Sequence, residues 1–164
     1  GTTNFSVSLC MTCVSIGFCS AEGKPVVGVI FAPATNEWYM AVKGYGAFCN
    51  GRRISPGKLE KKSMSKAVVC CEFGYSRKQE EIDAMLGAVS RILAKGCRAI
   101  RQLGSGCLDL CYVAMGQLDV VYAGVANEGW KPWDYAAALV ICTEAGCVME
   151  SIDQTPGDEF DLYS

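Results

Sequence analysis

The pattern of hydrophobic and polar positions in the first third of the chain is that of short strands. Apolar runs rich in Val, Ile, Cys and Phe alternate with short segments that contain Gly or Pro. The runs cover residues 6–19, 26–33, 37–43 and 47–54. In Gly44-Tyr45-Gly46, glycine can adopt the positive φ that a tight turn needs. The pattern predicts antiparallel strands arranged as a meander over residues 6–54.

The pattern changes after residues 58–66, which form a polar, basic connector. From there on, short apolar runs alternate with segments in which apolar residues recur at helical spacing. We expect strands at 67–73, 97–102 and 118–122, and helices at 77–95, 105–115 and 134–145. In the first helix the core-facing residues are expected to be Ile82, Met85, Leu86, Val89, Ile92 and Leu93. This alternation predicts an α/β layer, and the connector predicts a boundary between subdomains 1–57 and 67–164.

Composition and charge exclude two classes of protein. The 164 residues are 51% hydrophobic, which is enough for a substantial core in a globular protein. Charged residues interrupt the apolar N-terminal third before it reaches the roughly 20 residues of a membrane span, so we expect a soluble protein with no membrane partner. With 15 basic and 17 acidic residues, and no basic run interleaved with aromatics, nucleic-acid binding has no electrostatic support.

The cysteines favour a reducing compartment. There are 11 of them, an odd number, and most lie inside apolar runs such as the one around Cys70 and Cys71. We therefore expect thiols that serve as small hydrophobic residues, in the cytoplasm or another reducing compartment. Cys10 and Cys13 have C-x-x-C spacing, but the chain has no second pair and no histidine. Core packing is the preferred interpretation for this pair, over a zinc or redox site.

Asp134 stands directly before a helix-forming run of small and apolar residues. A carboxylate at the start of a helix can accept backbone N–H bonds and complement the helix dipole. The same oxygen atoms would suit Mg²⁺, a hard cation that keeps several waters and bridges to phosphate groups. Taken alone, the residue leaves both interpretations open.

Two Gly-rich stretches have the chemistry of anion or polyol binding. Gly104-Ser105-Gly106 opens the helix predicted at 105–115, and backbone N–H groups at such a start can receive a phosphate or a hydroxyl. Gly1-Thr2-Thr3-Asn4 combines a glycine with two hydroxyl side chains, which can cradle an anion and orient a water. An ordinary helix start and an ordinary turn are the structural alternatives.

In combination these stretches resemble the inositol monophosphatase family of Mg²⁺-dependent, lithium-sensitive phosphatases. Gly1-Thr2-Thr3-Asn4-Phe5 is similar to the second half of the family motif D-P-[ILV]-D-G-T-[TS]-N-F. Trp133-Asp134-Tyr135-Ala136-Ala137, with Glu144-Ala145-Gly146, is similar to the motif W-D-x-A-A…E-A-G-G. Segments 28–33, 41–51 and 101–110 also resemble the family pattern, in order. The resemblance therefore spans nearly the whole chain.

The resemblance implies a fold and a reaction. The fold is a layered αβαβα sandwich of the inositol monophosphatase and fructose-bisphosphatase type, of which we expect this chain to be a part lacking both ends. The reaction is hydrolysis of a phosphate monoester, first of all inositol monophosphate, by a metal-activated water. The resemblance also implies a small-molecule phosphate ester as ligand and a homodimer.

The residue roles come from the same resemblance. Asp134 is the expected Mg²⁺ ligand, and Thr2 is the expected catalytic residue because it would orient the attacking water. The expected substrate-binding residues are Gly1, Thr3, Gly104, Ser105, Gly106 and Glu128. The glutamate of the family usually lies seven residues before the W-D aspartate, where this chain has Asn127, and we expect Glu128 to replace it.

Several departures from the family pattern keep alternatives open. The family's metal-binding acids that precede the G-T-[TS]-N-F stretch are absent from these 164 residues, and Cys147 stands where a second glycine is expected. One carboxylate alone would hold Mg²⁺ poorly, so we expect this chain by itself to be inactive. The rival functions are a related sugar, histidinol or nucleotide phosphatase, and a non-catalytic relative that acts as a binding partner.

Overall fold

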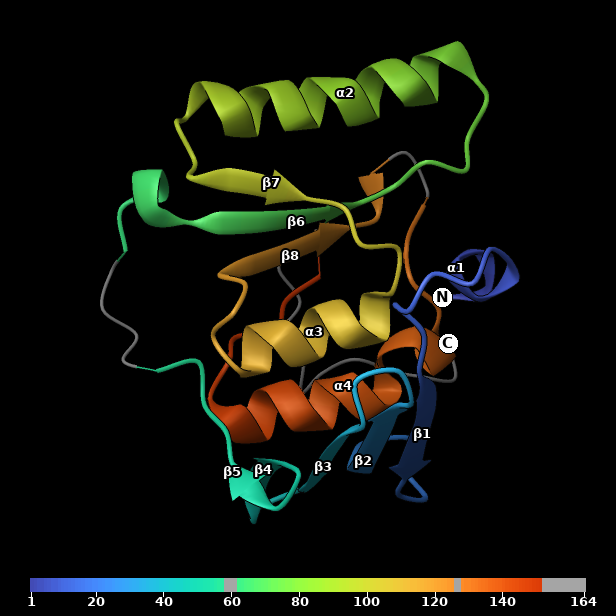
Figure 1. The fold of residues 1–164 in the computed structure, drawn as a ribbon, viewed down its shortest axis with the longest axis vertical. Coiled ribbons are helices and arrows are strands. Elements are labelled where there is room, and N and C mark those ends of the chain that lie inside the picture. The colour runs from blue at the N-terminus through green and yellow to red at the C-terminus, as the bar shows by residue number, and fades with distance from the viewer. Residues whose placement is uncertain (58–61, 126–127, 152–164) are drawn as a thin grey trace.

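The fold consists of alternating layers of helix and sheet. The computed structural model describes residues 1–57, 62–125 and 128–151. Seen from the top of Figure 1, helix α2 (Gln79–Ala94) covers a three-stranded sheet, and a five-stranded sheet forms the bottom. Helices α3 (Gly106–Ala114) and α4 (Pro132–Ala145) lie between the two sheets. This is an α/β sandwich, as predicted.

The five-stranded sheet is the predicted antiparallel meander. Its strands follow one another in chain order, and each pairs antiparallel with the next. They are β1 (Val14–Cys19), β2 (Pro25–Ala32), β3 (Glu37–Val42), β4 (Gly46–Cys49) and β5 (Arg52–Arg53). Gly44 and Gly46 adopt φ of 85° and 87° in the turn between β3 and β4, as the tight turn requires. The predicted strands at 26–33 and 37–43 are confirmed, and the first predicted strand is confirmed from residue 14 onward. The single strand predicted at 47–54 is wrong, because Asn50 and Gly51 adopt φ of 48° and 76° in a turn that divides it into β4 and β5.

The predicted start of the first strand, at residue 6, is wrong. Thr2–Ser6 forms the short helix α1, and residues 7–13 form a loop in which Ser8 has a φ of 60°. The Asn4 side chain donates a hydrogen bond to the backbone oxygen of Met11 at 3.0 Å, which folds this segment back on α1. A side-chain bond to the backbone thus replaces the strand pairing that the apolar composition favoured. Cys10 is exposed here, so the expectation that it packs in the core is also wrong.

The second sheet is parallel, with the strand order β7-β6-β8. The strands are β6 (Val68–Glu72), β7 (Ala99–Arg101) and β8 (Val120–Ala123), and a 3-10 turn, η1 (Met64–Lys66), precedes β6. Val89 and Ile92 of α2 pack against buried residues of this sheet, and Met85 and Ala88 are buried, but Leu86 and Leu93 are each 55% exposed. Two of the expected core-facing positions are therefore wrong, because a sheet of three strands covers only a narrow stripe of the helix.

Helix α4 is the centre of the larger core. The run from Ala137 to Cys142 is buried against the five-stranded sheet on one side and α3 on the other. Gly28 of β2 makes this close approach possible, because a Cβ at that position would lie 2.1 Å from the backbone oxygen of Ala137. Since α4 follows the connector in sequence yet packs on the sheet that precedes it, both segments share one core. The division into subdomains 1–57 and 67–164 stays a prediction.

We expect Gly28→Ala to lower the free energy of unfolding by about 3 kcal/mol, because the added methyl group would push β2 away from the α4 backbone. Gly87→Ala is the matched control, since a Cβ there would meet only the flexible end of Arg91 at 3.4 Å and alanine favours the helix. Urea unfolding of the purified protein measures both. Equal midpoints for the two variants would contradict this account of α4 packing.

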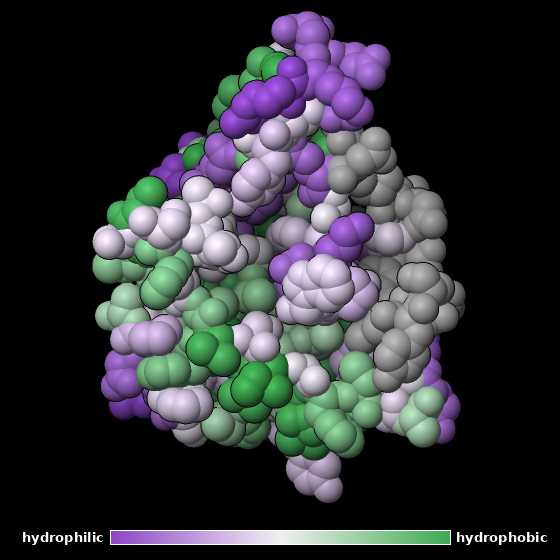
Figure 2. All heavy atoms as spheres, turned by 90° about the vertical axis from the view of Figure 1, so that its right-hand side faces the viewer, coloured by the Kyte–Doolittle hydropathy of each residue, from purple (hydrophilic) through white to green (hydrophobic). Residues whose placement is uncertain are grey.

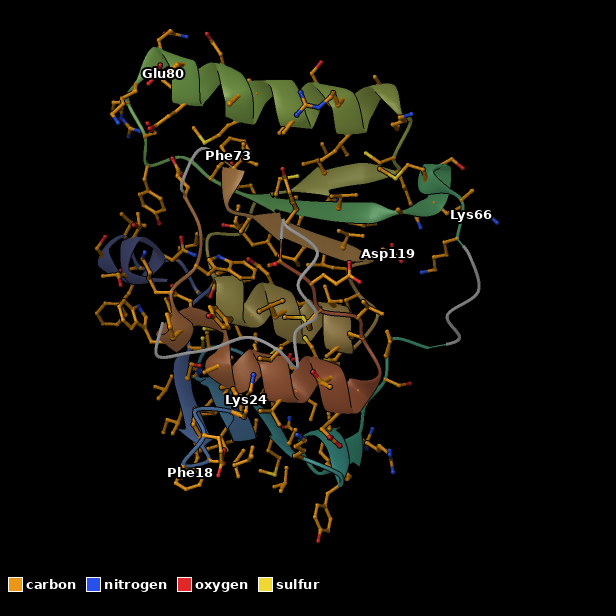
Figure 3. The ribbon with its side chains drawn as sticks, turned by 180° about the vertical axis from the view of Figure 1, so that it is seen from behind. Phe18, Lys24, Lys66, Phe73, Glu80 and Asp119 are labelled. Carbon is orange, nitrogen blue, oxygen red and sulfur yellow. The ribbon has the colours of Figure 1, made fainter. Side chains whose placement is uncertain are left out.

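The outer face of the five-stranded sheet is apolar and open among the described residues. The register brings side chains of β1, β2 and β3 into three rows across the sheet. The rows are Val14-Phe31-Trp38, Ile16-Val29-Met40 and Phe18-Val27-Val42. Hydrophobic residues gather over the lower part of the face in Figure 2, and Figure 3 shows Phe18 at the end of the molecule opposite α2. Phe18 is 65% exposed, so this face has the character of a surface that another layer covers.

None of the described helices combines the length and the hydropathy that crossing a bilayer requires. All eleven cysteines lie within the described residues and carry free thiols.

Candidate active site

A cavity of about 370 Å³ opens at the carboxyl ends of the three parallel strands. In α/β sheets this edge is where ligands bind, because the loops that leave the strands diverge there. Residues that follow β6, β7 and β8 meet residues from the starts of α1, α3 and α4 around it. The lining consists of Gly1, Glu72, Phe73, Tyr75, Gly104, Gly106, Cys107, Glu128, Gly129, Trp130 and Asp134.

Most of the site residues predicted from sequence converge on this cavity. Gly1, Gly104, Gly106, Glu128 and Asp134 all line it, although they lie as much as 133 positions apart in the chain. A larger cavity of about 780 Å³, bordered by β8 and residues 148–151, is lined by none of the predicted site residues. The smaller cavity is therefore the candidate active site.

Three predicted residues lie beside the cavity without lining it. Thr2 and Thr3 are exposed residues of α1, directly after the cavity-lining Gly1. Ser105 is 1% exposed, and its hydroxyl has no hydrogen-bond partner among the described residues. The backbone of Gly1 packs against it, since a Cβ at Gly1 would lie 3.5 Å from Ser105 Oγ. The two Gly-rich stretches thus meet, as the hypothesis of a shared site requires.

Asn4 and Glu72 hold the turn at Leu103 and Gly104 from opposite sides. The Asn4 amide donates hydrogen bonds to the backbone oxygens of Leu103 and Gly104 at 2.9 and 3.2 Å. Glu72 Oε1 accepts from the backbone N–H groups of the same two residues at 2.8 and 3.1 Å. Both backbone polar groups of each residue are satisfied by side chains, so this part of the cavity wall has a defined position.

Glycine is needed in this turn for two reasons. Gly104 has a φ of 72°, which side chains with a Cβ rarely adopt, and a Cβ there would lie 3.1 Å from Asn4 Oδ1. At Gly106 a Cβ would lie 2.8 Å from the indole ring of Trp130. The G-x-G spacing therefore brings Asn4 and Trp130 close to the start of α3.

Asp134 is the third residue of α4 and is half buried at the cavity. Its Oδ2 accepts a hydrogen bond from the backbone N–H of Lys131 at 2.8 Å, so it does cap the start of the helix. The helix begins at Pro132, two residues earlier than predicted. The Cys107 thiol donates to the Asp134 backbone oxygen at 3.0 Å, which joins α3 to this residue. The cap uses the Oδ2 oxygen, and no hydrogen bond among the described residues is recorded for Oδ1.

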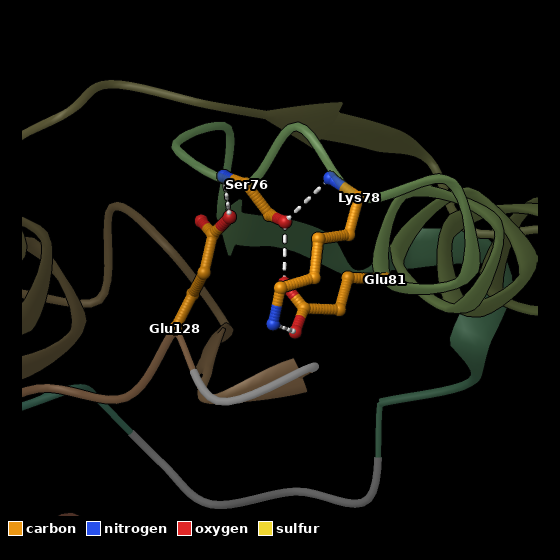
Figure 4. A network of polar contacts seen from close by, with 4 residues as sticks. All are labelled: Ser76, Lys78, Glu81 and Glu128. Atoms are coloured by element: carbon orange, nitrogen blue, oxygen red, sulfur yellow. Dashed lines mark hydrogen bonds and ion pairs between the residues drawn. The ribbon is translucent and has the colours of Figure 1, made fainter.

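Glu128 anchors the loop that follows β6. Its carboxylate accepts hydrogen bonds from the backbone N–H groups of Gly74, Tyr75 and Ser76. Ser76 in turn bonds to Glu81, which pairs with Lys78 at 3.2 Å (Figure 4). Burial acts to raise the pKa of Glu128, but the three amides outweigh it and hold the pKa below its usual range. Asn127, which lies seven residues before Asp134, is outside the described residues.

A second cluster of ligand-type atoms lies behind the wall of the cavity. Atoms of Cys70, Glu72 and Asp109 lie within 4.8 Å of one another, which satisfies the distance condition for a cation. The Cys70 thiol, however, donates a hydrogen bond to Glu72 Oε1 at 3.4 Å. Burial raises the pKa of this thiol, so it stays protonated, whereas a metal ligand must be a thiolate. We therefore do not assign a metal to this cluster.

The Glu-Ala-Gly motif near the end of α4 is structural. Glu144 accepts hydrogen bonds from the N–H groups of Gly44 and Gly46 through its two oxygens, each at 2.7 Å. Ala145 is buried, and Gly146 ends the helix with a φ of 95°. The motif fixes the far end of α4 to the turn between β3 and β4.

Comparison with known proteins agrees with this arrangement. A family model described as "Inositol monophosphatase family" matches residues 1–163. The chain belongs to the inositol monophosphatase family. It is 41% identical to "Inositol monophosphatase 2" of Solanum lycopersicum over 162 residues, which are 99% of this chain and 57% of that protein. It is 36% identical to "Inositol monophosphatase 1" of Bos taurus over 164 residues, which are all of this chain and 56% of that protein.

Solved structures of the family share the fold. The inositol monophosphatase of Anabaena (Nostoc) sp. PCC 7120 superposes with a TM-score of 0.79 at 33% identity, over 95% of this chain and 58% of that one. The enzyme of Thermotoga maritima gives a TM-score of 0.77 at 31% identity, over 99% of this chain and 57% of that one. The chain thus spans a little over half the length of its relatives. We call a chain of their length that contains these residues the full-length protein.

Proposed function

We propose that the full-length protein hydrolyses a phosphate monoester with the help of Mg²⁺, and that inositol monophosphate is its preferred substrate. One observation carries this proposal. Residues of both sequence motifs of the family, Gly1 and Asp134, line one cavity, which also holds the Gly104–Gly106 turn. Its volume of about 370 Å³ is at the small end of ligand sites and suits a compact, polar substrate.

Asp134 is the proposed magnesium ligand. The donor set fits the ion, because a carboxylate oxygen is the hard donor that Mg²⁺ prefers, and Oδ1 is not used by the helix cap. Bound Mg²⁺ would neutralise charge on the phosphate oxygens and lower the pKa of a water. Among the described residues, the other cavity carboxylates, Glu72 and Glu128, are both engaged by backbone amides.

The start of α1 is the proposed phosphate site. The first N–H groups of a helix have no acceptor within it, so those of Gly1 to Thr3 can donate to phosphate oxygens. In this proposal the Thr2 hydroxyl orients the attacking water, because it follows Gly1 at the mouth of the cavity. No covalent enzyme intermediate is required.

The wall formed by residues 104–106 and Glu128 is the proposed binding surface for the alcohol part of the ester. Gly104 and Gly106 present backbone, and the Ser105 hydroxyl is buried with no partner among the described residues. Glu128 would act chiefly by holding the 74–76 loop against the substrate, since its oxygens already accept three amide bonds. By resemblance to the family we also propose a homodimer and inhibition by lithium.

A panel of phosphate esters tests the proposal. The full-length protein is assayed for phosphate release from inositol monophosphate, histidinol phosphate, a sugar bisphosphate and a nucleoside monophosphate, with Mg²⁺ and with a chelator. The highest kcat/KM is expected for inositol monophosphate, with loss of activity in the chelator. A preference for another ester would favour a sister phosphatase. Absence of turnover on every ester, in a folded protein, would favour a non-catalytic relative.

A further inference from the structure

Asp109 is a fully buried acid with no role in the mechanism proposed above. It lies in the first turn of α3 and is 0% exposed. Neither of its carboxylate oxygens has a hydrogen-bond partner among the described residues. An ionised carboxylate in such a place would be very costly, so burial favours the protonated form, which needs an acceptor rather than a donor.

The acceptor next to it is Glu72. The ligand atoms of the two residues lie within 4.8 Å of each other, and Glu72 is half buried between Asp109 and the cavity that it lines. The same Glu72 carboxylate accepts from the N–H groups of Leu103 and Gly104. Asp109 is thus connected to the cavity wall through a single intervening side chain.

We propose that Asp109 is a positioning residue of the candidate active site. Its protonated carboxyl donates a hydrogen bond to Glu72, and Glu72 in turn holds the Leu103–Gly104 turn in the geometry that binds the alcohol part of the substrate. The role in substrate binding rests on the phosphatase function proposed above, whereas the hydrogen-bond relay itself does not.

The electrostatic surroundings support a protonated Asp109. Its oxygens are fully buried and lie within 4.8 Å of the Glu72 carboxylate, so both burial and a like charge oppose its ionisation. Burial first, then the nearby charge of Glu72, raises the pKa of Asp109 to about 8. The other titratable groups that act on Asp109 or are affected by it are Cys70, Cys107, Cys111 and Tyr112, and none of these favours its ionisation.

The sign of the pH dependence follows from the raised pKa. Below pH 8 Asp109 is protonated and donates to Glu72. As the pH rises through 8, Asp109 ionises, the donor is lost, and two negative charges face each other behind the turn. The hydrogen bonds from the backbone N–H groups of Leu103 and Gly104 to Glu72 should then weaken. Substrate binding should therefore weaken on the alkaline side of pH 8.

The experiment compares the full-length protein with its Asp109→Asn and Asp109→Leu variants between pH 6.5 and 9.5. Asparagine has the same shape and donates a hydrogen bond at every pH, whereas leucine cannot donate. We expect KM of the unsubstituted protein to rise about tenfold above pH 8, the scale of a lost hydrogen bond to a charged group. KM of the Asn variant should stay flat, and that of the Leu variant should be raised throughout. Asp83→Asn, on the exposed side of α2, is the matched control and should follow the unsubstituted protein.

A second readout is independent of activity. The backbone N–H signals of Leu103 and Gly104, followed by NMR, should titrate with a midpoint near pH 8 in the unsubstituted protein and not in the Asn variant. If the protein hydrolyses no ester, the proposed function fails, but this readout still shows whether Asp109 acts on Leu103 and Gly104 through Glu72. Identical titration of both amides in the two proteins would overturn the proposal. So would a stoichiometric metal ion that is bound at pH 7 and lost in the Asn variant.

Discussion

Asp134→Asn should lower turnover by the full-length protein by roughly a hundredfold or more, while it changes the free energy of unfolding by about 1 kcal/mol or less. Asparagine keeps an oxygen that can accept the hydrogen bond from the Lys131 N–H, so the start of α4 should survive. It loses the anionic oxygen that we propose as a Mg²⁺ ligand, and the affinity for the ion should fall with it. The measurement is kcat across a Mg²⁺ titration, together with thermal unfolding of the same sample.

Asp119→Asn is the control for this experiment. Asp119 also caps a backbone group, since it accepts from the Val68 N–H at 2.8 Å, and it pairs with Lys62 at 2.6 Å. It lies at the start of β8, the end of the sheet away from the cavity, and is labelled in Figure 3. Its substitution should cost stability and leave the Mg²⁺ requirement unchanged. If instead Asp134→Asn keeps near-normal turnover and an unshifted Mg²⁺ requirement, Asp134 is a cap and nothing more.

The parts of the fold that were predictable from sequence are those in which local pattern and tertiary packing agree. Apolar runs separated by segments with Gly or Pro located the meander, although the last run holds two strands instead of one, and helical spacing located α2 to within two residues at each end. The pattern failed where a single side chain overrides it. Residues 7–13 have strand-like composition, but hydrogen bonds from Asn4 fold them into a loop. The spacing of hydrophobic residues in a sequence does not reveal a hydrogen bond of this kind between a side chain and the backbone.

The sequence predicted the site residues that belong to motifs, but not the other residues that line the cavity. Gly1, Gly104, Gly106, Glu128 and Asp134 were named from sequence, and the fold brings them together. Glu72 and Trp130 were missed, because neither belongs to a motif. A signal for Glu72 did exist, since it is an acid directly after the apolar run 67–71, and carboxyl ends of parallel strands are where sites form. Asp109 could not have been singled out, because its position in sequence says nothing about its contact with Glu72.

We expect the 164 residues of this chain, expressed by themselves, to show little or no Mg²⁺-dependent phosphatase activity, in contrast to the activity that we propose for the full-length protein. The cavity of the described residues offers Asp134 Oδ1 to a cation, while Glu72 and Glu128 are engaged by backbone amides. A single carboxylate holds Mg²⁺ poorly, because the ion usually shares two or more carboxylate or phosphate ligands. Phosphate release from inositol monophosphate, measured for both proteins under one set of conditions, checks this.

The open apolar face of the five-stranded sheet makes a control for folding necessary, since a chain that associates through Val14, Ile16 and Phe18 could lose activity for that reason alone. Circular dichroism and a cooperative thermal transition should establish that the isolated chain is folded before its activity is compared. A folded but inactive chain is the expected result, and it would place the missing cation ligands outside these 164 residues. Robust turnover by the isolated chain would contradict this, and it would mean that residues described here, Glu72 and Glu128 first among them, exchange their amide bonds for the metal.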